Sequence, residues 1–182
     1  GNAGASNVLY GDAVTMTGRA TGGDDVLEAP FAPAPRQAAY SELYGDAYTL
    51  ADRAQGGDDV LRGASGYLGS TALLFGDGHE LRDHAAGGND TLVSTSARTD
   101  EMWGDAYTVG PDAATGADTF VFAPGNGRDI IHDFEPGKDR IDLTAFAETG
   151  LHTFEQLSNL IHAQPDGSLV ILDLGGAVAF LP

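Results

Sequence analysis

Apolar residues in the first two thirds of the chain come in short bursts such as VLY, YTL and DVL, each bounded by Gly and Asp. Such bursts predict many short strands separated by turns, whereas an amphipathic helix would repeat apolar positions every three to four residues. Glycine makes up 26 of the 182 residues, about twice its usual share of ~7%, so the chain must turn often and tightly. The pattern therefore predicts an all-β protein with very short strands.

The bursts lie in a phrase that the chain repeats four times. YGDAVTMTGRATGGDDVL at 10–27 and YGDAYTLADRAQGGDDVL at 44–61 are close copies, and FGDGHELRDHAAGGNDTL at 75–92 and WGDAYTVGPDAATGADTF at 103–120 are weaker ones. The copies have one length, with GD eleven residues ahead of GG or TG, while the joining stretches vary, giving periods of 34, 31 and 28 residues. Such periods predict a repeat architecture in which each unit buries its apolar face by stacking on its neighbours.

Charge is the next informative feature, because 27 Asp and Glu residues face only 9 Lys and Arg, a net charge of −18. Nucleic acids and anionic membrane surfaces would be repelled by this field, and no basic stripe reverses it locally, so we exclude both as partners. The acids recur at two repeat positions. The first row is Asp12, Asp46, Asp77 and Asp105, and the second row, thirteen residues later, is Asp25, Asp59, Asp90 and Asp118.

Aspartate also favours turns for its own reasons, because its side chain caps nearby backbone donors, and a purely turn-forming role stays open for these residues. In stacked coils, however, equivalent carboxylates would lie about one strand spacing apart, ~4.8 Å, and unpaired like charges at that distance repel. Calcium would remove the repulsion, since it accepts about six to eight oxygen ligands and combines carboxylates with backbone carbonyls. The candidate ligands are the eight row aspartates and their neighbours Gly22, Asp24, Gly56, Asp58, Gly87 and Asn89.

Other metals and catalysis find little support in the sequence. There is no Cys, and the five histidines do not recur with the repeat, which disfavours transition metals. His79 and His84 in HELRDH are five residues apart, whereas a zinc protease helix needs them four apart on one face. A nucleophile-elbow motif G-x-S-x-G is also missing. We therefore predict no catalytic residues and no enzyme activity.

At this point the repeats resemble a known family, the RTX (repeats-in-toxin, or hemolysin-type) calcium-binding proteins. GGDDVL, GGDDVL and GGNDTL are similar to the second half of their nonapeptide G-G-x-G-x-D-x-(apolar)-x. The resemblance implies a right-handed parallel β-roll, in which the 18-residue unit, two nonapeptides long, makes one full turn. It also implies bound Ca²⁺, passage through a type I secretion apparatus, and a secreted, extracellular or cell-surface location. The fourth copy has TGAD in place of GGDD, and we expect it to bind calcium least typically.

The chain stops repeating after Phe122, and GADTFVFAPGNGRDIIHDFEPGKDRIDLTAF at 116–146 resembles the segment after the β-roll in serralysin-type proteases and alginate-epimerase R-modules. The resemblance implies that Asp133, Asp139 and Asp142 help to finish or cap the roll, some of them in contact with calcium. A solvated strand with alternating acids is the open alternative for each. We therefore divide the chain into calcium-binding repeats at 1–122 and a capping segment at 123–182 that continues the roll.

Within the capping segment, TFEQLSNLIHA predicts one short helix. Thr153 is its expected N-cap and Gln156 completes a capping box, while the apolar face would comprise Phe154, Leu157, Leu160 and Ile161. SLVILDLGGAVAFL at 168–181 then predicts the final strands.

We predict a non-enzymatic calcium-binding module, part of a larger secreted bacterial protein, that folds on export and carries or stabilises a neighbouring domain. No apolar stretch of about 18 residues predicts a membrane span, and Gly1 opens without a signal-peptide pattern. The alternative is a carbohydrate-binding or adhesive module. A glycan would then contact the loops expected at 28–42, 62–72 and 93–101, with Tyr40 and Tyr67, or the recurring aromatics Tyr44, Phe75 and Trp103, for which stacking in the core is the favoured role.

Overall fold

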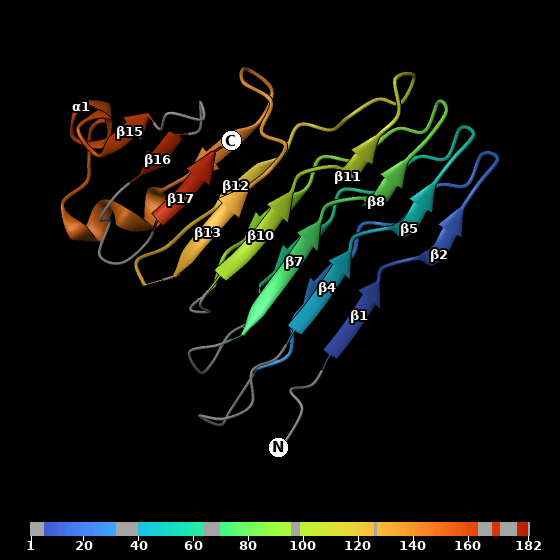
Figure 1. Ribbon diagram of the computed structural model, residues 1–182, viewed down its shortest axis with the longest axis horizontal. Helices are drawn as coiled ribbons and strands as arrows, with labels where there is room; N and C mark the ends of the chain where they lie inside the picture. Colours follow the sequence, from blue (N-terminus) through green and yellow to red (C-terminus); the bar gives the residue numbers. More distant parts are fainter. Residues whose placement is uncertain are drawn as a thin grey trace.

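The computed structural model describes residues 6–31, 40–63, 70–95, 99–125, 127–163, 169–171 and 178–181. The chain winds into four successive coils, and each coil contributes one strand to each of three parallel sheets. Figure 1 shows the coils advancing from the blue β1 to the orange β13, beyond which the capping segment closes one end. This β-solenoid confirms the predicted β-roll class and the resemblance to RTX repeats.

The three sheets have the following members. The first sheet contains β1 (Ser6–Tyr10), β4 (Tyr40–Tyr44), β7 (Thr71–Phe75), β10 (Thr99–Trp103) and β13 (Arg128–Ile131). The second contains β2 (Ala13–Met16), β5 (Ala47–Leu50), β8 (Gly78–Leu81) and β11 (Ala106–Val109). The third contains β3 (Val26–Glu28), β6 (Val60–Arg62), β9 (Thr91–Val93), β12 (Thr119–Val121) and β14 (Arg140–Asp142).

One turn of the solenoid is the whole repeat period, not the 18-residue unit that the resemblance implied. Leu43 pairs with Leu9 in the preceding coil and with Leu74 in the following one, which pairs in turn with Met102. The ends of the expected loops at 28–42, 62–72 and 93–101 are therefore strands β4, β7 and β10. Sequence analysis missed these strands because they lie upstream of the repeated phrase and share little sequence among coils.

Each coil encloses two apolar clusters. The larger lies between the first and third sheets and includes Leu43, Leu61, Leu74, Leu92 and Phe120. The smaller lies inside the lobe formed by the second sheet and its turns, and includes Leu50, Ala54 and Leu81. Between them the chain is pinched into a waist, where the GD corner between the first and second sheets meets the GG segment that precedes the third sheet.

The recurring aromatics form a ladder outside the larger core. Leu43 faces that core, so its neighbour Tyr44 points to the opposite face of the strand. Tyr44 stacks on Tyr10 and on Phe75, and Phe75 stacks on Trp103, with ring centroids 5.1, 4.8 and 4.6 Å apart. The recurring aromatic residues therefore stack on one another, as expected, but in a separate buried cluster.

The capping segment continues the solenoid past residue 122. β13 and β14 extend the first and third sheets, and a 3₁₀ helix, η1 (Thr144–Thr149), follows and buries Phe146 in the larger core. Sequence analysis did not predict η1. β15 (Ile161–Ala163), β16 (Leu169–Ile171) and β17 (Val178–Leu181) then complete the first sheet, with β17 parallel to β13 and the other two antiparallel, which confirms the predicted final strands.

The predicted helix exists but is shorter than expected. α1 (Phe154–Ser158) begins with the predicted capping box, in which the Thr153 hydroxyl accepts from the Gln156 N–H and the Gln156 side chain accepts from the Thr153 N–H. Leu157 packs against the larger core, whereas Phe154 is 77% exposed, and Ile161 belongs to β15 rather than to the helix. The helix is too short to bring all four apolar residues to one face. Neither described helix is long and apolar enough to cross a membrane.

Candidate metal sites in the waist

The first row of aspartates holds the waist together within each coil. Oδ1 of Asp46 accepts a 3.0 Å hydrogen bond from the backbone N–H of Gly57, eleven residues later in the same coil. Asp12, Asp77 and Asp105 make the same bond to the equivalent N–H groups, at 2.9, 2.7 and 2.5 Å. This contact gives a physical reason for the constant distance between GD and GG in the sequence, because the carboxylate can reach the donor only if the intervening lobe keeps one length.

The second row connects coils to one another. Oδ1 of Asp59 accepts from the backbone N–H of Asp25 at 2.7 Å, Oδ1 of Asp90 from that of Asp59 at 2.7 Å, and Oδ1 of Asp118 from that of Asp90 at 2.8 Å. Asp59, Asp90 and Asp118 thus each bind the preceding coil, and the row runs parallel to the solenoid axis.

Glycines let carboxylates of successive coils converge. A Cβ built on Gly56 would collide with the carboxylates of Asp46 and Asp77, which belong to adjacent coils. Gly22 stands in the same way between Asp12 and Asp46, and Gly87 between Asp77 and Asp105. These three glycines, all predicted site residues, mark the gaps between neighbouring members of the first row.

The second row approaches backbone oxygen in a similar way. A Cβ on Gly45 would collide with Oδ2 of Asp59 and with the carbonyl oxygen of Gly76 in the next coil. Gly76 repeats the arrangement with Asp90 and the carbonyl of Gly104. Carboxylate and carbonyl oxygens from adjacent coils therefore lie close to the same point beside each of these glycines.

The remaining carboxylate oxygens in the waist lack hydrogen-bond partners. Among the described residues, one buried Oδ2 atom without a partner occurs in each of Asp46, Asp59, Asp77, Asp90 and Asp118. A buried acceptor left unsatisfied costs about 1–3 kcal/mol, and more when it is charged. All five atoms are carboxyl oxygens in two adjacent rows, so cations bound between the coils would satisfy them.

Burial and mutual repulsion change how these carboxyl groups titrate. Burial raises the pKa of Asp46 and of Asp118 to about 8, and that of Asp59 to about 7, with neighbouring carboxylates adding to the rise. The pKa values of Asp77 and Asp90 are raised well above their ordinary value for the same reasons. Without a counter-ion the waist therefore favours protonated aspartates near neutral pH, and a cation that binds must displace these protons.

The type of donor limits which metal fits. Nowhere in the described part of the chain do three or more His, Asp or Glu side chains gather as a metal cluster. A cation in the waist would therefore combine about two carboxylates with backbone carbonyls, a mixed oxygen shell of the kind that calcium accepts. Such a shell lacks the nitrogen and sulfur ligands that structural zinc requires.

Other predicted site residues lie at the ends of the rows or outside them. Asp133 extends the first row, accepting from the N–H groups of Gly104 and Asp105, and Asp139 extends the second, accepting from those of Asp118 and Glu135. Asp142 does not join either row, because its carboxylate accepts from the backbone and hydroxyl of Thr144 at the start of η1.

Three further candidates form an exposed ladder on the solvent side. Oδ1 of Asp24 accepts from the N–H of Asp58, that of Asp58 from the N–H of Asn89, and that of Asn89 from the N–H of Ala117. The structure does not bring these side chains to the buried rows, and their role as ligands stays a prediction.

The sequence did not predict a pair of buried acids that lies outside the two rows. Asp100 and Asp129 lie on β10 and β13, where Oδ1 of Asp129 accepts from the N–H of Asp100 at 2.9 Å and Oδ2 from the hydroxyl of Ser94 at 2.5 Å. The register places Ala72 and Ser41 at the same position in earlier coils. No repeated acid marks this position, so the periodic signal that revealed the two rows does not extend to it.

Comparison with known proteins supports one relationship. No curated protein and no solved structure gives a significant match to the chain. The family model for the C-terminal part of the M10 peptidases, described as "Peptidase M10 serralysin C terminal", matches residues 48–165. This span covers most of the second copy of the repeat, the third and fourth copies, and most of the capping segment, and it is the C-terminal region of those proteins rather than their peptidase domain. The chain therefore belongs to the serralysin C-terminal family, whose repeats are of the RTX type.

Proposed function

We propose that this protein is a calcium-binding RTX-type module of a larger secreted bacterial protein. The observation that carries the proposal is the set of buried, unpartnered carboxylate oxygens of Asp46, Asp59, Asp77, Asp90 and Asp118, arranged in two rows along the solenoid. A folded protein does not ordinarily keep several such atoms side by side, because buried polar groups are almost always hydrogen-bonded. Calcium ions between the coils would satisfy the carboxylates and join neighbouring repeats.

Calcium would also link folding to location. An ion that binds only the folded state stabilises it by mass action, by about 2.7 kcal/mol per site when its concentration is 100 times the dissociation constant. Extracellular calcium modules commonly bind at about 10⁻⁴ to 10⁻³ M. The family membership supports a secreted parent chain, in which this module would fold after export and carry or stabilise a neighbouring domain.

Isothermal titration calorimetry with calcium tests this function, with magnesium as the control ion. Calcium should bind with a dissociation constant in the micromolar to millimolar range, and magnesium should compete poorly, because it demands tight octahedral geometry and retains its waters. A protein that binds neither ion, or binds both equally, would not be a module of this kind.

A groove on the outside of the solenoid favours glycan binding as a second candidate function. The groove has a volume of about 770 Å³ and is lined by the aromatic ladder, by Tyr48, His79 and Tyr107 beside it, and by acids that include Glu42 and Glu101. Tyr48 and Tyr107 are 37% and 60% exposed, and aromatic rings with acids and hydroxyls are common where sugars bind. The acidic field would select neutral or cationic sugars over anionic ones.

A glycan array probed in millimolar calcium tests this second function. Tyr107→Ala should abolish a genuine signal, whereas Phe154→Ala should leave it unchanged, because Phe154 is an exposed aromatic residue that does not line the groove. Tyr40, suggested as a contact by the sequence, does not line the groove itself but donates a hydrogen bond to Glu42, which does. Tyr67, the other loop tyrosine suggested by the sequence, lies outside the described residues. An array without any signal from the calcium-loaded protein would remove this candidate.

A further inference from the structure

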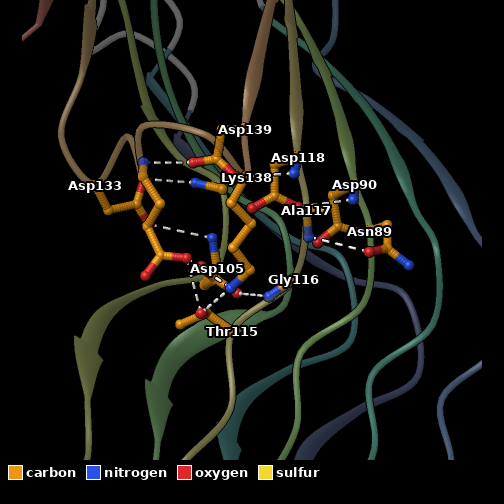
Figure 2. A network of polar contacts seen from close by, with 12 residues as sticks. Asn89, Asp90, Asp105, Thr115, Gly116, Ala117, Asp118, Asp133, Lys138 and Asp139 are labelled. Carbon is orange, nitrogen blue, oxygen red and sulfur yellow. Dashed lines mark hydrogen bonds and ion pairs between the residues drawn. The ribbon is translucent and has the colours of Figure 1, made fainter.

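The last gap of the first row differs from the inner gaps. At the position that Gly22, Gly56 and Gly87 occupy in the first three coils, the fourth coil has Thr115. The only lysine of the chain, Lys138, reaches this position from the turn after β13. Its ammonium donates hydrogen bonds to the hydroxyl of Thr115 and to Oε2 of Glu135, the latter at 2.6 Å. Figure 2 shows the Lys138 side chain extending toward Thr115, beside Asp105.

Asp105 and Asp133 flank this terminal gap. Asp133 accepts two backbone hydrogen bonds, from Gly104 at 2.8 Å and from Asp105 at 3.1 Å, and Asp105 accepts one from Gly116 at 2.5 Å. The ammonium of Lys138 acts on Asp105 electrostatically, lowering its pKa against the larger rise caused by burial. A positive charge of the chain itself therefore lies near Asp105, at one side of the terminal gap.

The distribution of unpartnered oxygens agrees with this difference. In the described part of the chain, Asp46 and Asp77 each have a buried oxygen without a partner, whereas both oxygens of Asp133 accept backbone hydrogen bonds. The terminal gap therefore offers a cation fewer free carboxylate oxygens than the inner gaps do.

We propose that the Lys138 ammonium, held beside the terminal gap by Thr115 and Glu135, keeps calcium out of the gap between Asp105 and Asp133. The inference rests on the proposed function, in which calcium occupies the inner gaps at Gly22, Gly56 and Gly87. Lys138 is then the residue that ends the first row and limits the number of ions it binds.

Two measurements test the role of Lys138. The first counts calcium ions per chain by equilibrium dialysis. Lys138→Met removes the charge but keeps most of the side chain, so it should open the terminal gap and raise the count by one ion, whereas Lys138→Arg should leave the count unchanged. Arg140→Gln is the matched control, because it removes an exposed positive charge two residues away and should not alter the count. An unchanged count in a folded Lys138→Met variant would overturn the proposal.

The second measurement uses the wild-type chain, so it stands even if the methionine variant does not fold. Anomalous diffraction from crystals soaked with terbium, a calcium substitute, should place ions at the inner gaps and none between Asp105 and Asp133. An ion in that terminal gap of the wild-type protein would overturn the role of Lys138 alone. A wild-type chain that binds no ion in any gap would instead refute the proposed function itself.

Discussion

Asp46 and Gly57 are joined by a hydrogen bond across the waist of the second coil. The N–H of Gly57 donates to Oδ1 of Asp46 at 3.0 Å, while Oδ2 of the same carboxylate is buried without a partner. One oxygen of this side chain thus closes the coil, and the other faces the next coil. The same division between a structural oxygen and an unsatisfied one recurs at Asp77. We infer that the hydrogen bond sets the shape of the coil and that the second oxygen is available to bind a cation.

This division predicts that Asp77→Asn stabilises the calcium-free protein and reduces the stabilisation that calcium provides. The amide oxygen can still accept from Gly88, so the coil keeps its closing bond, and the buried charge disappears. Without calcium the variant should be more stable than the wild type by about 1–3 kcal/mol. Adding calcium should stabilise the variant by less than it stabilises the wild type. The osmolyte trimethylamine N-oxide favours the compact state, so the osmolyte concentration at half-folding in EDTA measures stability without calcium. The melting temperature in calcium measures stability with the ion. Destabilisation under both conditions would mean that the second oxygen has an unidentified protein partner.

Position along the solenoid should decide how much a second-row aspartate matters. Asp59 is buried and has a coil on each side, whereas Asp25 lies in the first described coil and is partly exposed. In a stacked array each unit is stabilised by its neighbours, so an inner break costs more. Asp59→Asn should raise the calcium concentration at half-folding more than Asp25→Asn does, and should lower cooperativity. Circular dichroism during calcium titration at fixed salt measures both. Equal and small shifts of the calcium midpoint in the two variants would favour the alternative in which these aspartates only form turns.

The raised pKa values predict an inverted pH dependence in calcium-free buffer. Folded pKa values of about 7 for Asp59 and about 8 for Asp46 and Asp118 exceed the ordinary value of 3.8. Between these limits the folded state binds more protons than the unfolded state, so stability must fall as pH rises. Circular dichroism should therefore detect more structure at pH 5 than at pH 8.

Saturating calcium should reverse the trend, because protons compete with the ion for the same oxygens. The calcium midpoint should rise as the pH is lowered from 8 to 5. A calcium-free protein whose structure does not depend on pH in this window would contradict the raised pKa values.

Close coil-to-coil contact predicts a position-dependent effect of adding one methyl group. A Cβ on Gly57 would overlap the carbonyl oxygen of Gly23 in the preceding coil, whereas a Cβ on Gly23 meets only Asp12 Oδ1, at 3.8 Å. Gly57→Ala should lower stability by about 1–3 kcal/mol or more, and Gly23→Ala, the matched control, should change it by less than ~1 kcal/mol. Melting temperatures in millimolar calcium provide the comparison. Equal effects would mean that the coils are further apart than the structure has them.

Much of the fold could be predicted because repetition makes a weak local signal strong. A single GGDD segment predicts only a turn, whereas four equivalent segments in copies of constant length predict stacked coils. Stacked coils bring Asp59 and Asp90 close together. The length of one turn could not be obtained in this way. β4, β7 and β10 follow joining stretches of different lengths, and they share only a leucine or methionine before an aromatic residue, which is too short a pattern to indicate a strand.

Features without repetition were less accessible to prediction. The buried pair Asp100 and Asp129 occurs once, after Ser41 and Ala72 at the same register position. Lys138 lies within the segment at 116–146 that resembles known capping segments, but no local pattern indicates that its ammonium reaches Thr115, 23 residues earlier. Capping of α1 was predictable because Thr153 and Gln156 interact within one turn, whereas the exposure of Phe154 depends on how the whole segment packs.

The central claim is that the waist requires calcium, and circular dichroism in calcium and in chelator tests it most directly. The protein should show strong β-structure in millimolar calcium, lose most of the signal from its repeats in excess EDTA, and regain it when calcium, but not magnesium, is restored. A spectrum in EDTA identical to that in calcium at pH 8, where the carboxylates are least protonated, would contradict the account.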